Sequence, residues 1–185
     1  MKEDIIILDD FLTPSYHQYL LDLVLSPNMS WYYNKNISVG IEKNVDLDKF
    51  GFTHTVFGSE SSSSSLHLLL LPFLWKIKDL IGAKEVIRCR LDMTVYNPNN
   101  YLHERHIDIN TPHYVAIYYV NDSDGETIIY NQKQQKNKNN FDLSIRKKIE
   151  PKANRILIFN GEYFHTGHSP SKNSTRILIN SNFVK

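Results

Sequence analysis

His106 and Asp108, separated by one residue, form the first pair in the chain whose types and spacing suggest chemistry. In an extended chain, residues two apart point to the same side, so an imidazole and a carboxylate can bind one ion while Ile107 turns into the core. A third ligand must then come from a distant strand. Two histidines and one carboxylate on one face of Fe(II) leave three positions open, as a bidentate co-substrate and O2 require.

His165 is the third ligand that the sequence favours. It follows an apolar strand predicted at 155–159 and the turn Asn160-Gly161-Glu162. His168 competes for the same role, because it lies only three residues further on and is also near a turn. We prefer His165 because the number of residues that separate it from the predicted strand and from Arg176 suits a metal ligand better. His168 stays open as the alternative.

Two other histidines flank the pair, and we do not expect either to bind the metal. His103 lies three residues before His106, which puts it on the wrong face of an extended strand. His113 follows Pro112 at the start of a new strand. The predicted metal ligands, which are also the catalytic residues, are therefore His106, Asp108 and His165.

Arg176 lies eleven residues beyond His165, after the turn-forming run from Ser169 to Asn173. This length suits a return on a neighbouring strand. A guanidinium can hold a carboxylate with two parallel hydrogen bonds, and this charge-assisted pair is stronger than a neutral one. Arg176 is therefore the predicted anchor for the far carboxylate of a dicarboxylic co-substrate such as 2-oxoglutarate.

Strands dominate the half of the chain that carries these residues. From Val86 the apolar period is two, with Ile87, Cys89, Leu91, Met93 and Val95 on one face and Arg88, Arg90, Asp92, Thr94 and Tyr96 on the other. Further strands are predicted at 114–120, 127–130, 155–159 and 176–184, separated by turn-forming clusters. Consecutive strands joined by short turns favour an antiparallel sandwich or barrel.

The first part of the chain is predicted to support and cover this sheet. A short strand at 5–8 precedes a helix that begins at Thr13-Pro14 and ends at Ser26-Pro27, and a second helix spans about 66–81 with Pro72 inside it. The segment 34–58 shows no sustained period and is interpreted as irregular or weakly paired strand, and the serine run 61–65 as a loop whose last serine caps the second helix; together, 34–65 is a candidate lid. The Asn-, Lys- and Gln-rich stretch 131–148 is interpreted as a solvated loop. The fold class is α+β.

The composition limits the number of domains, the kinds of partner and the cysteine chemistry that the chain can have. The 185 residues, 41% of them hydrophobic, suit a single domain over 1–185. With 21 basic and 20 acidic residues, the chain has no global field to attract nucleic acid or an anionic membrane. Cys89 is the only cysteine, which excludes an intrachain disulfide and a thiolate zinc site. No signal peptide or membrane span is expected, so we expect a cytoplasmic protein without a membrane partner; the sequence does not indicate its oligomeric state.

The ordered string of motifs resembles the iron(II)/2-oxoglutarate-dependent oxygenases, and among them the prolyl-hydroxylase-like branch. It consists of His106-x-Asp108, Ala116-Ile-Tyr-Tyr-Val-Asn121, Asp124-Gly125-Glu126-Thr127, Ile158-Phe159 before His165, and Arg176-Ile-Leu-Ile-Asn180. The resemblance covers about residues 86–184.

The resemblance implies a double-stranded β-helix, or jelly-roll, core at about 86–184 with the metal at one open end, supported by helices from about 1–85. It implies Fe(II), 2-oxoglutarate and O2, with ascorbate as a possible addition in vitro, and hydroxylation of a peptide, prolyl side chains first, or of a small molecule, with release of succinate and CO2. It further implies that Tyr96 contacts the co-substrate and that Tyr118 reaches its far carboxylate.

Two rival functions use the same residues. One is a jelly-roll binding module that keeps the ligands without turnover. The other is a zinc-dependent hydrolase, since imidazole and carboxylate also suit Zn(II). Arg176 argues against the hydrolase, because zinc hydrolysis needs no distant carboxylate anchor.

Overall fold

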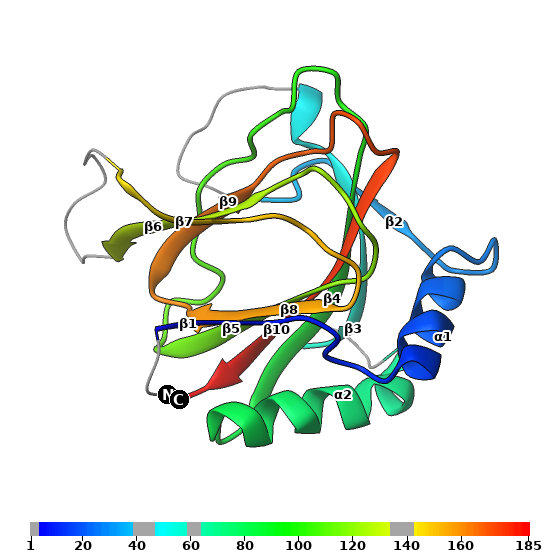
Figure 1. Ribbon diagram of the computed structural model, residues 1–185, viewed down its shortest axis with the longest axis vertical. Coiled ribbons are helices and arrows are strands. Elements are labelled where there is room, and N and C mark those ends of the chain that lie inside the picture. The colour runs from blue at the N-terminus through cyan, green and yellow to red at the C-terminus, as the bar shows by residue number, and fades with distance from the viewer. Residues whose placement is uncertain (1–3, 39–46, 59–63, 134–142) are drawn as a thin grey trace.

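Two antiparallel sheets and two helices form the fold in a computed structural model, which describes residues 4–38, 47–58, 64–133 and 143–185 (Figure 1). The larger sheet has the strand order β1-β8-β5-β10-β4-β3-β2, and the smaller has the order β7-β6-β9. The strands are β1 (Ile5–Leu8), β2 (Tyr32–Asn34), β3 (Gly51–Phe57), β4 (Val86–Val95), β5 (His113–Tyr119), β6 (Thr127–Lys133), β7 (Ile145–Ile149), β8 (Arg155–Asn160), β9 (Tyr163–Gly167) and β10 (Thr175–Val184).

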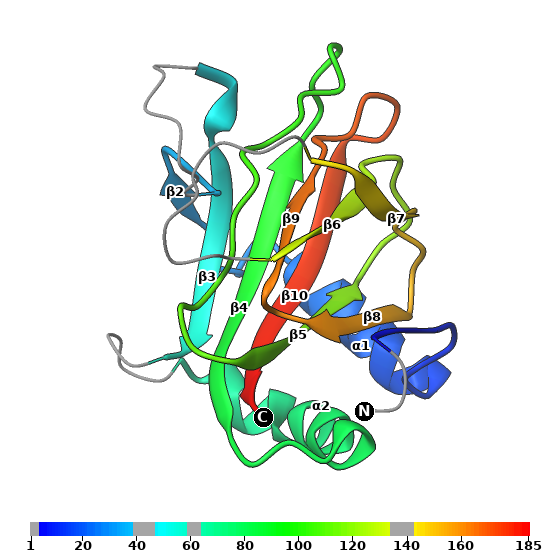
Figure 2. The same ribbon diagram turned by 90° about the vertical axis from the view of Figure 1, so that its left-hand side faces the viewer.

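The two sheets form the predicted jelly-roll core. Strands β4 and β10 run antiparallel side by side at the centre of the larger sheet (Figure 2), with Arg176 opposite Thr94 and Asn180 opposite Arg90. The period-two pattern of β4 is confirmed: Cys89 and Leu91 join the core on the helix side, and the polar positions face the smaller sheet.

Helices α1 (Pro14–Val24) and α2 (Leu66–Ile81) cover the outer face of the larger sheet (Figure 1). Both confirm the sequence prediction: α1 has Pro14 in its first turn, and α2 contains Pro72 and ends at Gly82, whose positive φ of 64° suits glycine. No helix in the described ranges has the length and apolar character needed to cross a bilayer.

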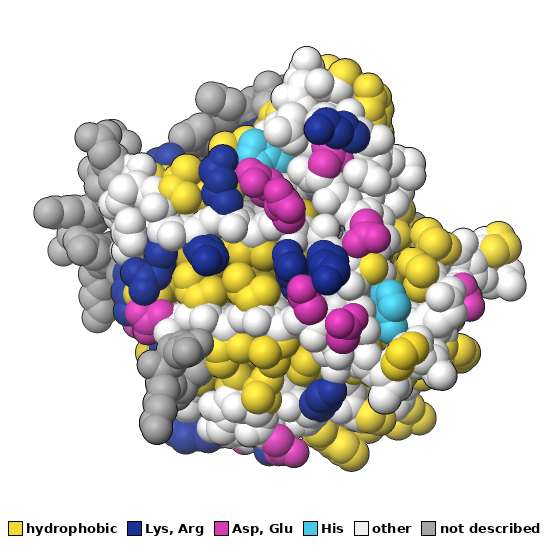
Figure 3. All heavy atoms as spheres, viewed as in Figure 1, with side chains coloured by type: hydrophobic (Ala, Val, Ile, Leu, Met, Phe, Trp, Pro, Cys, Tyr) yellow, Lys and Arg dark blue, Asp and Glu magenta, His cyan; other side chains and the backbone are white. Residues whose placement is uncertain are grey.

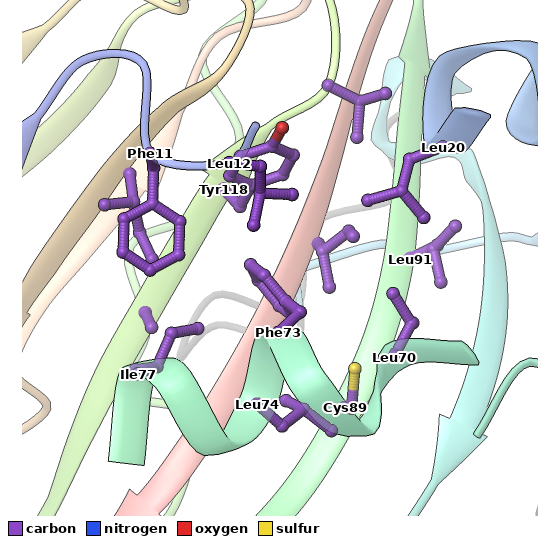
Figure 4. Close-up of a cluster of buried hydrophobic side chains, with 14 of the residues drawn as sticks. Phe11, Leu12, Leu20, Leu70, Phe73, Leu74, Ile77, Cys89, Leu91 and Tyr118 are labelled. Atoms are coloured by element: carbon purple, nitrogen blue, oxygen red, sulfur yellow. The ribbon is translucent and has the colours of Figure 1, made fainter. Parts of the chain in front are cut away.

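Two hydrophobic clusters lie between the layers of the fold. The first fills the space between the helices and the larger sheet, where Phe11, Phe73 and Tyr118 meet (Figure 4). The second lies between the two sheets and includes Ile117 and Tyr119. Strand β5 is therefore buried on both faces, and neighbouring residues of this strand belong to different clusters.

Parts of the sequence interpretation were wrong. Strand β7 lies in the stretch expected to be loop, and its Arg146-Lys-Lys core is exposed, so no apolar period marks it. No strand was predicted at β9: the sequence analysis placed only the turn 160–162 before His165, yet residues 163–167 form a strand that pairs with β6. In the proposed lid, β3 pairs with both β2 and β4, with a register shift between Thr55 and Phe57. Residues 39–46 and 59–63 of the proposed lid, and residues 134–142 of the expected loop, lie outside the described residues.

Asp124 fixes the turn that leads from β9 into β10. Its carboxylate accepts hydrogen bonds from the backbone N–H groups of Ser171, Lys172 and Asn173 and from the Ser171 hydroxyl. Burial alone would raise the pKa of Asp124, but these hydrogen bonds lower it to about 2. The ionised form therefore stabilises the fold.

We expect Asp124→Ala to lower the free energy of unfolding by roughly 1–2 kcal/mol near pH 6, after allowance for solvent screening. Because the folded pKa lies below the unfolded value of about 3.9, this contribution is complete above about pH 5 and disappears as the pH falls towards 2. Urea unfolding of both proteins at pH 6 and pH 3 measures the difference. Asp22→Ala is the surface control, and an Asp124 effect of equal size at both pH values would contradict this account.

Candidate metal centre and co-substrate pocket

The side chains of His106, Asp108 and His165 converge, and one potential donor atom from each lies within 4.8 Å of the other two. The Nε2 atoms of His106 and His165 lie 3.4 and 3.8 Å from the same Asp108 oxygen, Oδ1. Ile107 packs against the apolar cluster of Ile128, Tyr130 and Phe164, as the alternation of side chains predicts. Three donors from two distant segments therefore face one point.

Backbone pairing sets the spacing of the two histidines. His106 N–H donates to His165 O at 3.0 Å, and His165 N–H donates to His106 O at 3.1 Å. Residues that exchange both bonds lie directly opposite each other, so their side chains leave the ladder on the same side. The ring centroids are 4.5 Å apart.

The protonation of the three groups suits a metal. His106 Nδ1 faces the carbonyl of Glu104 at 3.1 Å, and His165 Nδ1 faces that of Tyr163 at 3.3 Å. A carbonyl can only accept, so each Nδ1 carries the proton and each Nε2 is the atom directed at Asp108. The Nε2 atom of His165 is buried without a hydrogen-bond partner among the described residues, as is expected of a metal-ligating atom.

Electrostatics supports the same arrangement. Burial, with a smaller contribution from the neighbouring His106, lowers the pKa of His165 to about 4, so His165 is neutral at physiological pH. Burial opposes charge on His106 and on Asp108 as well, but their mutual attraction prevails, raising the pKa of His106 and holding that of Asp108 well below its usual range. A neutral His165 and an ionised Asp108 are the forms in which these groups bind a metal ion.

Asn180 and Asn182 hold the carboxylate of Asp108. Their amide groups donate to its Oδ2 at 3.1 and 2.8 Å, and Arg88 approaches Oδ1 at 3.5 Å. These contacts leave Oδ1 directed at the histidines. The sequence interpretation gave neither asparagine a role, although Asn180 ends one of its motifs and both lie on the Arg176 face of β10 at period two, a signal that could have found them.

Arg176 lies in the same pocket, which also contains His106, His165 and Thr127. Its side chain is buried, it donates to Thr127 Oγ1 at 2.7 Å, and its Nε has no partner among the described residues. No salt bridge within the described ranges includes Arg176. A buried cation without a carboxylate partner is costly, and burial lowers its pKa accordingly, so the pocket is suited to an anion.

The geometry of β9 places this cation at a useful distance from the metal ligands. Thr127 is opposite Gly167, two residues or about 6.5 Å along the strand from His165. A Cβ on Gly167 would lie 3.1–3.4 Å from the Arg176 guanidinium, and one on Gly125 would lie 2.7 Å from its Cδ. The two glycines therefore provide the space that the arginine occupies.

The structure does not bring the two predicted tyrosines to this pocket. Tyr118 faces the helices, where its hydroxyl contacts His17 and Asn154 at 2.7 and 3.1 Å (Figure 4). Tyr96 follows the end of β4 and is 54% exposed. The neighbour of Tyr118, Tyr119, is the tyrosine beside the anchor: its hydroxyl donates to Thr127 Oγ1 at 2.7 Å, and Arg176 lies 5.7 Å from its ring centre.

This difference gives a paired prediction. Tyr119→Phe should raise the KM for 2-oxoglutarate about 5- to 30-fold, equivalent to about 1–2 kcal/mol, because Thr127 and Arg176 lose a hydroxyl that orders them. Tyr118→Phe should leave that KM unchanged and instead lower the free energy of unfolding by about 1 kcal/mol. Succinate formation at varied 2-oxoglutarate and urea unfolding measure the two effects; a KM effect confined to Tyr118→Phe would reverse the assignment.

The other histidines of this half lie outside the cluster of His106, Asp108 and His165 found among the described residues. His168 Nδ1 bonds the carbonyl of Asn100 at 2.8 Å, outside the cluster, so the structure brings His165 and not His168 to the other two ligands. His103 is buried in the pocket wall and bonds Ser169 at 2.9 Å. His113 bonds the carbonyl of Thr111 at 2.7 Å.

Basic and acidic side chains are intermixed on the face shown in Figure 3. Several of the basic groups are paired, Arg146 with Asp4 and both Lys152 and Arg155 with Asp9. This mixture agrees with the balanced charge of the sequence.

Comparisons with known proteins place the chain in a family. The model of the 2OG-Fe(II) oxygenase superfamily matches residues 91–184, just over half of the chain, and the protein belongs to this superfamily. The family uses Fe(II) and 2-oxoglutarate, and His106, Asp108 and His165 form the candidate metal site. Comparison with curated protein sequences gives no match.

Solved structures share the fold. A prolyl-4-hydroxylase from Pseudomonas putida is 14% identical, with 100% of this chain and 94% of that chain covered and a TM-score of 0.60. A Trichoplax adhaerens prolyl hydroxylase, solved with a hypoxia inducible factor peptide fragment, is 18% identical (98% and 83% covered, TM-score 0.60). A non-heme alpha ketoglutarate dependent epimerase from nogalamycin biosynthesis is 10% identical (99% and 79% covered, TM-score 0.66).

Proposed function

We propose that this protein is a hydroxylase that uses Fe(II), 2-oxoglutarate and O2 to oxidise a C–H bond of a peptide or small-molecule substrate, with release of succinate and CO2. The observation that carries the proposal is one pocket lined both by His106 and His165, the two histidines that converge with Asp108, and by the buried guanidinium of Arg176, which has no carboxylate partner among the described residues. The first suits Fe(II) with open positions, and the second suits the far end of a dicarboxylate.

Each group has a defined part in this proposal. His106, Asp108 and His165 hold the iron, which supplies the activation of O2 when it is bound. Arg176, with Thr127, binds and orients the far carboxylate of 2-oxoglutarate. The imidazole of His165 and the guanidinium of Arg176 are 3% and 6% exposed, so the pocket around them excludes most water and strengthens these charged contacts.

A peptide is our first choice of substrate, with prolyl side chains first, and small molecules are the second. The support is similarity alone: prolyl hydroxylases, one of them solved with a peptide fragment, share the fold. The epimerase and a carbocyclase from nogalamycin biosynthesis share it too, so the fold serves several outcomes. In this chain Ile37 and Ser38 from the N-terminal half add a wall to the pocket, and loops of this kind usually set selectivity.

Anaerobic protein loaded with Fe(II) and 2-oxoglutarate provides the test. We expect a visible charge-transfer absorption before air is admitted and succinate afterwards, with a gain of one oxygen in a peptide or metabolite extract. Absorption without succinate would favour a binding module without turnover. Hydrolytic activity with Zn(II) alone, together with no oxidation in the presence of Fe(II) and ascorbate, would favour a hydrolase and overturn the proposal.

A further inference from the structure

A buried ion pair links the 3-10 turn to the segment that carries two of the metal ligands. Lys49, at the end of the 3-10 turn Leu47–Lys49, forms a salt bridge with Glu104, which lies in the connection that carries His106 and Asp108. Each side chain is 10% exposed. The two partners are 55 residues apart in the sequence.

Glu104 also orients a metal ligand through its main chain. Its carbonyl oxygen accepts the Nδ1 proton of His106 at 3.1 Å, which fixes the tautomer and directs Nε2 at Asp108. The side chain of Glu104 thus pairs with Lys49, while its main-chain carbonyl orients His106. A movement of the main chain at Glu104 would change both contacts, and the salt bridge with Lys49 restrains this movement.

The main chain of Lys49 holds a wall of the pocket. Its carbonyl accepts a hydrogen bond from Ile37 N at 3.0 Å, and Ile37 is 8% exposed and lines the pocket. Gly51 makes this close approach possible, because a Cβ there would lie 2.4 Å from Ile37 Cδ1 and 2.9 Å from the Met93 carbonyl. Lys49 therefore contacts the wall through its backbone and the ligand loop through its ammonium group.

From these contacts we propose that Lys49 is a positioning residue for the metal centre: its salt bridge with Glu104 holds the carbonyl that orients His106. The inference rests on the proposed function of the site. Removal of one partner of a buried ion pair leaves an uncompensated charge, which must move towards water. In Lys49→Met the main chain at Glu104 loses this restraint, and the His106 ring loses the fixed acceptor that sets its tautomer.

Metal binding and imidazole NMR test the inference without turnover. In Lys49→Met we expect the affinity for Co(II), used as a spectroscopic probe, to fall about 10- to 100-fold, as for other groups that orient a ligand. In metal-free protein the imidazole 15N shifts of His106 should change from the pattern of an Nδ1–H tautomer to an average. Lys49→Arg should restore both properties to within about threefold, and Glu104→Gln should reproduce part of the loss.

The controls are Lys152→Met and Glu162→Gln, which make the same chemical changes in surface pairs with Asp9 and Lys185. If Lys49→Met binds Co(II) like the wild type and keeps the His106 tautomer, the positioning role is excluded while the metal site stands. If the wild type itself fails to bind Co(II), the proposed function fails, and the metal-free NMR data still decide the role of Lys49. If Lys49→Met does not fold, Glu104→Gln and Lys49→Arg provide the decision.

Discussion

His165→Ala is expected to abolish metal-dependent turnover and to weaken Fe(II) binding by at least about 10³-fold. His165 supplies a buried donor without another partner in the described structure, and loss even of a group that only orients a ligand costs about 10- to 100-fold. Calorimetric or spectroscopic titration with Co(II), followed by succinate formation with Fe(II), measures both effects. The variant should stay folded, because the backbone bonds between residues 106 and 165 do not depend on the imidazole.

His168→Ala is the matched control, since it removes the same side chain three residues away. This imidazole bonds the carbonyl of Asn100 outside the cluster, so the variant should bind metal and produce succinate like the wild type. The opposite result, with loss in His168→Ala and retention in His165→Ala, would refute the metal assignment.

Arg176→Met is expected to have opposite effects on co-substrate binding and on stability. The KM for 2-oxoglutarate should rise by about 30- to several-thousand-fold, corresponding to about 2–5 kcal/mol for one partner of a buried charge pair. Without co-substrate, however, the wild-type guanidinium is buried with no salt bridge among the described residues. Methionine of similar length should therefore leave the ligand-free protein as stable or make it more stable.

Anaerobic 2-oxoglutarate binding and urea unfolding separate these two effects. Arg155→Met is the control, because Arg155 pairs with Asp9 at the surface, and its loss should cost some stability without affecting the KM. Arg176→Lys should retain part of the affinity, since it keeps the charge but loses the planar fork. A variant Arg176→Met that is strongly destabilised yet binds 2-oxoglutarate normally would show that Arg176 is structural.

The candidate centre was proposed from signals that are local in the sequence. The spacing of His106 and Asp108 puts both side chains on one side of the chain, and the polar face of β4 follows from a clear period of two. The α2 boundaries follow from the apolar run and from Gly82. The position of Arg176 also follows from the length of a turn.

The tyrosines could not be placed from the sequence, for a physical reason. In β5, Ile117, Tyr118 and Tyr119 are all buried, because helices cover one face of the strand and the smaller sheet covers the other. A strand that is apolar on both faces does not reveal its phase. Only the long-range register, in which Tyr119 pairs with Leu178 of β10, decides which hydroxyl lies beside the anchor.

Tyr96 and β7 were harder to predict for other reasons. The β4 pattern continues to Tyr96, but the strand ends at Val95, and a side chain beyond the last ladder pair no longer obeys the alternation. Strand β7 is stabilised by its pairing with β6 and not by burial of its own side chains. Because its basic residues are exposed, the sequence shows no apolar period there from which a strand could be predicted.

The connection between β4 and β5 has no strand of its own, and two isolated bridges attach it to β9 and to the residue that follows β9: His106 with His165, and Leu102 with His168. The position of His106 therefore depends on this pairing. Any fluctuation that breaks it also separates the two imidazoles, so the stability of the pairing sets an upper limit on how long the centre stays assembled.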